Sequence, residues 1–134
     1  IMKGKIKPPR YRHFKYGDKY VNTLLCRLRV GRSYLNADSY KIGHSDTDLC
    51  NCGQKETVAH FFVCRNYSAQ QEILQTKCNS ILPNFKNLSN KKKLEIFLYG
   101  YNLESAEFDC RNIPLTFAVQ KYTLSTKRFS DQNN

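Results

Sequence analysis

The strongest constraint on this chain is a group of three cysteines and one histidine within fifteen residues. Their spacing is Cys50-x-Cys52-x7-His60-x3-Cys64. Thiolates and an imidazole in this number complete the tetrahedron that zinc prefers, and a site with four protein ligands is structural. Gly53 permits a tight turn beside the first two cysteines. His60 and Cys64, four residues apart, would lie on one face of a predicted helix. We therefore predict one structural Zn²⁺ ion.

Other interpretations of these residues remain open. The six cysteines of the chain could form the disulfides of a secreted protein, but no secretion signal is seen and only three of them cluster. The cluster could also consist of ordinary buried thiols and a core histidine. His44 could replace one of the four ligands. We expect Cys26, Cys78 and Cys110 to be core or surface thiols, and we expect a reducing, intracellular compartment.

Apolar residues recur at helical spacing along most of the chain, whereas strand-like alternation is nearly absent. The first expected helix follows Asp18, a favoured N-terminal cap, and ends at Gly31. Its apolar stripe leaves Arg27 and Arg29 facing solvent or a ligand. Residues 106–113 are ambiguous. Further helices are expected over residues 33–42, 56–65, 68–82, 89–100 and 114–129.

Several side chains of these helices have expected roles. Ser89 can cap the helix that follows it. The apolar stripe of the helix over 68–82 includes Ile73, Leu74 and Cys78. Phe61, Phe62 and Val63, which lie between the last two candidate ligands, are expected to pack the knuckle against its neighbours.

These patterns predict an all-α fold, a small helical domain of five or six short helices organised around a structural zinc knuckle at residues 50–64. Residues 1–17 contain Pro8-Pro9 and no helical period, so they are expected to form a basic extended arm preceding a helical zinc-binding domain at 18–134. No apolar run approaches the ~18–20 residues that span a bilayer, and no membrane partner is expected. The chain begins within a basic stretch, as expected for a piece of a longer protein.

Positive charge is concentrated at the start of the chain. The net charge is +11, and residues 1–32 hold ten Lys and Arg side chains against one acid. Such a block attracts polyanions, first nucleic acid and then acidic membrane, or it is a solvated tail that acts as a linker or localisation signal. The candidate phosphate contacts are Arg10, Arg12, Lys15, Arg27, Arg29 and Arg32. The candidate rings for stacking on bases, each with a structural role as the alternative, are Tyr11, Phe14 and Tyr16.

Longer stretches of the sequence carry a family resemblance. They are Leu25–Gly31, Leu35-Asn36 and Tyr40–Gly43, followed by Cys50–Gly53, Glu56–Val58, His60–Phe62, Cys64 and Tyr67. Together they resemble the C-terminal region of LINE-type (non-LTR) retrotransposon reverse transcriptase polyproteins, densely over residues 10–70 and weakly beyond. Many relatives have a proline after the last cysteine of the knuckle, where this chain has Arg65-Asn66.

The resemblance implies a non-catalytic module that helps hold template RNA, target DNA or both during target-primed reverse transcription in the nucleus. Its partners would be RNA or DNA and the polymerase domain of the same polyprotein. The alternative is a zinc-stabilised structural module that docks on the polymerase without binding nucleic acid. An enzyme such as a zinc deaminase would need an open coordination position and a Glu beside a ligand His, whereas Ala59 and Phe61 flank His60. We expect no catalytic activity in this chain.

Overall fold

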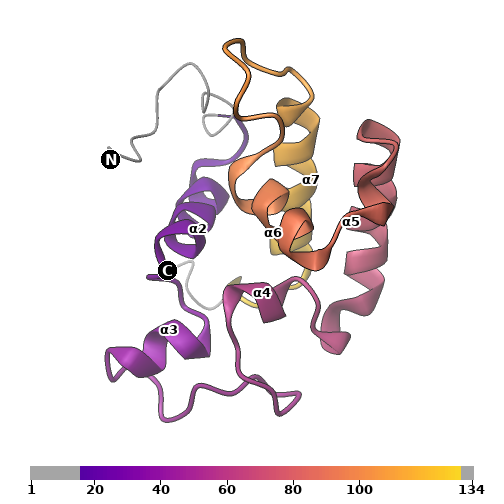
Figure 1. Cartoon of the computed structure of the whole chain (residues 1–134). Coiled ribbons are helices and arrows are strands. Elements are labelled where there is room, and N and C mark those ends of the chain that lie inside the picture. The colour runs from indigo at the N-terminus through magenta and orange to yellow at the C-terminus, as the bar shows by residue number, and fades with distance from the viewer. Residues whose placement is uncertain (1–15, 131–134) are drawn as a thin grey trace.

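The computed structural model describes residues 16–130, which form short helices joined by loops (Figure 1). The predicted all-α class is confirmed, since this part of the chain has no strand and only one isolated antiparallel bridge, between Leu49 and Lys55. No helix within it is long and apolar enough to cross a lipid bilayer. The elements are α2 (Lys19–Val30), α3 (Asn36–Lys41), α4 (Val58–Phe61), the 3-10 turn η2 (Arg65–Tyr67), α5 (Ser68–Ile81), the 3-10 turn η3 (Phe85–Asn87), α6 (Asn90–Tyr99) and α7 (Asn112–Ser125).

Helix α2 follows its sequence prediction closely. The Asp18 carboxylate accepts a hydrogen bond from the Tyr20 amide at 2.6 Å, and the helix ends at Gly31. The stripe of apolar residues that the spacing predicted is buried: Val21, Leu24, Leu25 and Leu28. Burial of these four side chains attaches α2 to the rest of the domain.

Helix α7 is the central element of the domain and lies between α2 and α5 (Figure 1). Its apolar residues Leu115, Val119 and Tyr122 are buried, and so are the polar residues Thr116 and Gln120 on other faces. The buried residues cover more than one side of the helix, so α7 has neighbours on several sides. α7 therefore packs against three other helices, α2, α5 and α6. The side that carries Phe117, Lys121 and Leu124 is exposed.

A cluster of aromatic rings connects α4 to the C-terminal end of the chain. Phe61 is 1% exposed, and its ring centroid lies 5.1–5.7 Å from those of Phe62, Tyr67, Tyr122 and Phe129. These separations are favourable for paired aromatic rings. The cluster holds the short helix α4, which could not persist as one isolated turn.

Two helices begin later than the sequence predicted. Helix α3 was predicted to start at Ser33 but starts at Asn36. The reason is that the Ser33 hydroxyl accepts a hydrogen bond from the Leu35 amide and donates one to the Asp38 carboxylate. This serine turn replaces the first turn of the expected helix. Predicted from about residue 56, α4 begins at Val58 and is capped by the Thr57 hydroxyl.

Two apolar residues that the pattern placed inside the core lie at the surface. Ile73 of α5 is 62% exposed, although Leu74 and Cys78 of the same helix are buried as predicted. Val63, predicted to pack the knuckle against its neighbours, is also exposed. The prediction for both residues is therefore wrong.

Candidate metal centre

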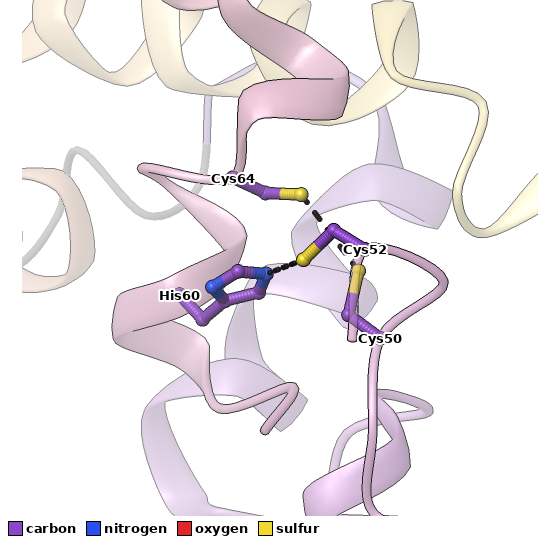
Figure 2. A group of neighbouring side chains, drawn as sticks. All are labelled: Cys50, Cys52, His60 and Cys64. Atoms are coloured by element: carbon purple, nitrogen blue, oxygen red, sulfur yellow. Dashed lines mark hydrogen bonds between the residues drawn. The ribbon is translucent and has the colours of Figure 1, made fainter. Parts of the chain in front are cut away.

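The first two cysteines lie on a tight turn that precedes α4. The Cys50 amide donates to the Gln54 carbonyl at 2.6 Å, and the Gly53 amide donates to the Cys50 carbonyl at 2.9 Å. Gly53 has a φ of 96°, a conformation that glycine adopts without a steric penalty. The turn brings the Cys50 and Cys52 thiols toward the same point (Figure 2).

The other two candidate ligands do not share a helix. His60 lies in α4, where its amide donates to the Thr57 hydroxyl at 3.1 Å, but the helix ends at Phe61. The chain then turns, with the Val63 amide donating to the His60 carbonyl, and Cys64 follows in extended conformation. The predicted common helical face is therefore wrong, yet the turn returns the Cys64 thiol to the side of the imidazole (Figure 2).

The four side chains converge on one point. Their ligand atoms all lie within 4.8 Å of one another. Cys50 Sγ lies 3.7 Å from Cys64 Sγ, and Cys52 Sγ lies 3.2 Å from His60 Nε2 (Figure 2). Sulfur ligands in a tetrahedron about 2.3 Å from a metal are separated by roughly 3.8 Å. The group therefore has a donor set and a size that can hold a metal ion.

The pKa values of the first two thiols are shifted in opposite directions. Burial raises the pKa of the Cys50 thiol to about 11, whereas a backbone hydrogen bond from Gln54 lowers the pKa of Cys52. The Asn66 amide also donates to Cys64 Sγ at 3.4 Å. Buried thiols ionise when a bound metal supplies the compensating charge.

Two of the three alternative interpretations disagree with the structure. All six cysteines are free, which contradicts the disulfide interpretation. His44 is exposed and does not belong to the cluster. Cys78 is buried in the core, and Cys26 and Cys110 are at the surface, as predicted for thiols outside the site.

A buried ion pair that the sequence analysis missed supports the loop beside the cluster. Arg128 donates to both carboxylate oxygens of Glu56 at 2.7 and 2.8 Å, and the Glu56 side chain is 3% exposed. The same carboxylate accepts from the Asn36 amide at 2.7 Å, and the Glu56 amide donates to the Asp48 carbonyl. Arg128 thus joins the knuckle to α3 and to the C-terminal end. Nothing local in the sequence signals this pair, because its members lie 72 residues apart.

Most of the predicted arm lies outside the described residues, including Arg10, Tyr11, Arg12, Phe14 and Lys15. Tyr16 is described: the residue is 39% exposed, and its carbonyl accepts hydrogen bonds from the side chains of Asn22 and Gln120. The start of the described chain is therefore attached to both α2 and α7.

The three predicted arginines of the α2 region differ in their surroundings. Arg27 and Arg32 are exposed, and the Arg27 guanidinium lies over the Tyr34 ring at 5.0 Å from its centroid. Arg29 instead turns inward and donates to the Leu98 carbonyl, and burial lowers its pKa to about 10. The expectation that Arg29 faces outward is wrong, because its long side chain reaches across to α6.

Arg27 also borders a shallow depression along the outer side of α2. This depression has a volume of about 560 Å³, and Lys19 lines it together with Asn22 and Thr23. No carboxylate lines it. A surface of this kind offers two cations and neutral polar groups to an anionic ligand.

Comparison of the chain with protein-family models, curated proteins and solved structures finds no match in any of the three. The resemblance to retrotransposon polyproteins therefore stays a prediction.

Proposed function

We propose that this chain is a non-catalytic module that binds RNA or DNA through the cations of α2 and is held in shape by one structural zinc ion. From the sequence resemblance, we further propose that it comes from the C-terminal region of a non-LTR retrotransposon reverse transcriptase and acts in the nucleus. The observation that carries the binding function is the carboxylate-free depression bordered by Lys19 and Arg27.

Zinc is the metal that we propose for the cluster, because three thiolates and one imidazole in a closed tetrahedron match its preferences. Cys50 and Cys52 would bind from the turn, His60 from α4, and Cys64 from the segment before η2. The ion would cross-link these three segments. With four protein ligands no position is left for water or substrate, so the proposed role is structural.

The two cations of α2 line the same depression. Lys19 and Arg27 are eight residues apart on one helix, which corresponds to about 12 Å along its axis. A separation of this length lets the two cations reach different phosphates of one strand, since each strand of a duplex carries one phosphate per about 3.4 Å of helix axis. Arg32 is exposed just beyond the end of the helix, and its carbonyl accepts a hydrogen bond from the Arg27 guanidinium at 3.3 Å. Each phosphate contact would release counterions and make the affinity depend on salt.

A titration of the full chain with single-stranded RNA, single-stranded DNA and duplex over a series of salt concentrations tests the binding function. The informative variant is the pair Lys19→Ala and Arg27→Ala. We expect it to lower the affinity about ten-fold and to reduce the slope of log K against log salt by about 1.4–1.8.

The matched control removes the same charge from another surface. Lys91 and Lys92 are exposed on α6, and their replacement by alanine should leave the salt slope within error. Equal losses in both double variants would show binding by net charge alone and contradict a site on α2. If no salt-sensitive binding to any of the three ligands occurred, the alternative would gain support: a zinc-stabilised module that docks on the polymerase domain.

A further inference from the structure

A groove lies between α5 and α7. Helix α5 is on the side of α7 away from α2 (Figure 1). The groove has a volume of about 380 Å³, and its lining includes Leu74 and Ala118, which belong to the core, as well as the exposed Ile73 and Phe117. Ile73 is 62% and Phe117 45% exposed. Scattered apolar side chains are common on protein surfaces, but these two open onto one continuous apolar depression. Such a surface is typical of a binding site for another molecule.

The charges around this groove are of one sign. Lys77 of α5 and Lys121 of α7 line it, and both are exposed. No carboxylate is among its lining residues, and within residues 16–130 neither ammonium group forms an ion pair with an acid. An occupant with apolar side chains between acidic ones would complement both features.

The shape of the groove determines the backbone conformation of its occupant. Its walls are two helices, and the described part of the chain has no open sheet edge to which an extended peptide could add as a strand. The wall formed by α7 runs from Pro114 to Ser125, about 16 Å at the rise of an α-helix. About three turns of a docked helix would fill it, with apolar anchors at i, i+3 or i+4, and i+7.

We propose that the α5–α7 groove binds an acidic amphipathic helix of a protein partner. Apolar residues of the partner pack on Ile73 and Phe117, and its carboxylates pair with Lys77 and Lys121. This interaction is separate from the binding of nucleic acid on α2, and either function could fail without the other.

The probe is a fluorescent helical peptide of about 15 residues, with leucines at the anchor spacing and glutamates on both sides of them. The full zinc-loaded chain is titrated into it, and fluorescence anisotropy is measured. A second peptide carries lysine in place of each glutamate, and a third has the first composition with the leucine spacing scrambled. We expect the acidic helical peptide to bind at least ten-fold more tightly than either of the others.

Variants of the chain locate the binding surface. Phe117→Ser should weaken binding of the acidic peptide about ten-fold, since central aromatic anchors dominate such interfaces. The exposed Val30 of α2 is the control, and Val30→Ser should change nothing. The pair Lys77→Glu and Lys121→Glu should reverse the preference, so that the lysine peptide binds better than the acidic one. All these residues are exposed, and a thermal unfolding curve for each variant verifies that the fold is kept.

Several results would overturn this assignment. Equal affinity for all three peptides, no binding of the acidic peptide, or an unchanged preference after charge reversal would each do so. A concentration-dependent dimer that Phe117→Ser abolishes would assign the groove to a second copy of this chain instead. A loss of RNA or DNA binding in the Phe117→Ser variant would assign it to nucleic acid.

Discussion

In the group of Cys50, Cys52, His60 and Cys64, backbone amides as well as side chains determine the properties of the thiols. Cys52 and Cys64 each accept a hydrogen bond from a backbone amide two residues further along the chain, that of Gln54 and that of Asn66 respectively. Such bonds stabilise the thiolate form that binds a metal. The local turns therefore prepare the sulfur atoms as ligands and also aim them at one point.

Removal of one ligand should remove the metal. We expect Cys64→Ala to lower the zinc content from about one ion per chain to nearly none and to reduce the free energy of unfolding by several kcal/mol. Elemental analysis of the purified protein and chemical denaturation measure the two effects.

The control for this variant is another thiol outside the cluster. Cys26 is exposed, and Cys26→Ser should keep both the zinc content and the stability of the parent chain. A full complement of zinc in Cys64→Ala, or an equal loss of zinc in Cys26→Ser, would contradict the proposed ligand set.

At the level of elements, polar side chains of α7 form hydrogen bonds to the neighbouring segments. The Tyr122 hydroxyl donates to the Phe61 carbonyl at 2.6 Å and so holds the end of α4. The side-chain amide of Gln120 donates to the Tyr16 carbonyl at 2.7 Å and to Asn22 Oδ1 at 2.8 Å. These bonds hold the start of α2 against α7. These bonds explain why α7 buries polar as well as apolar residues: a buried carbonyl needs a donor.

Loss of one of these donors should destabilise the domain without creating a large cavity. Tyr122→Phe leaves the Phe61 carbonyl buried and without its donor, and we expect a cost of about 1–2 kcal/mol. Urea denaturation measures it. Tyr40, which is 52% exposed, supplies the control, since Tyr40→Phe should change the stability by less than about 0.5 kcal/mol. Equal effects of the two substitutions would show that the hydrogen bond does not contribute.

At the scale of the whole molecule, Arg128 and Phe129 connect the knuckle at residues 50–64 to the helices. Phe129 is buried against Phe61, and its carbonyl accepts a hydrogen bond from the Tyr20 hydroxyl at 2.8 Å. The neighbouring Arg128 pairs with Glu56, and this pairing raises the pKa of Arg128 above its ordinary value. The loop of Cys50 and Cys52, α2 and the segment around Phe129 thus form one unit, so a metal ion bound in the loop would stabilise the entire domain.

Breaking the buried ion pair should therefore affect global stability. Arg128→Ala leaves the Glu56 carboxylate buried without its partner, and we expect a loss of about 3 kcal/mol in the free energy of unfolding. The exposed pair of Lys92 and Glu95, 3.9 Å apart, is the comparison. Lys92→Ala should cost less than about 1 kcal/mol. Unfolding in guanidinium, followed by circular dichroism, measures both, and similar costs for the two variants would refute the structural role of Arg128.

Much of this architecture could be predicted from residues close together in the chain. The Asp18 cap, the buried stripe of α2 and the Ser89 cap of α6 were all predicted correctly. The four residues of the metal cluster were also identified, because their types and spacing over 50–64 carry the signal. In each case the interacting groups are close together in the sequence, so a short stretch of sequence is enough to predict their interaction.

The remaining features depend on contacts between distant segments. Arg29 turns inward because a carbonyl of α6 accepts its hydrogen bond, and Glu56 is buried because Arg128 reaches it from the chain end. Ile73 has the spacing of a core residue but lies at the open side of the α5–α7 groove. Periodicity shows that a helix has an apolar face, but the width of the buried part depends on which neighbours cover it. Those neighbours come together only when the chain has folded.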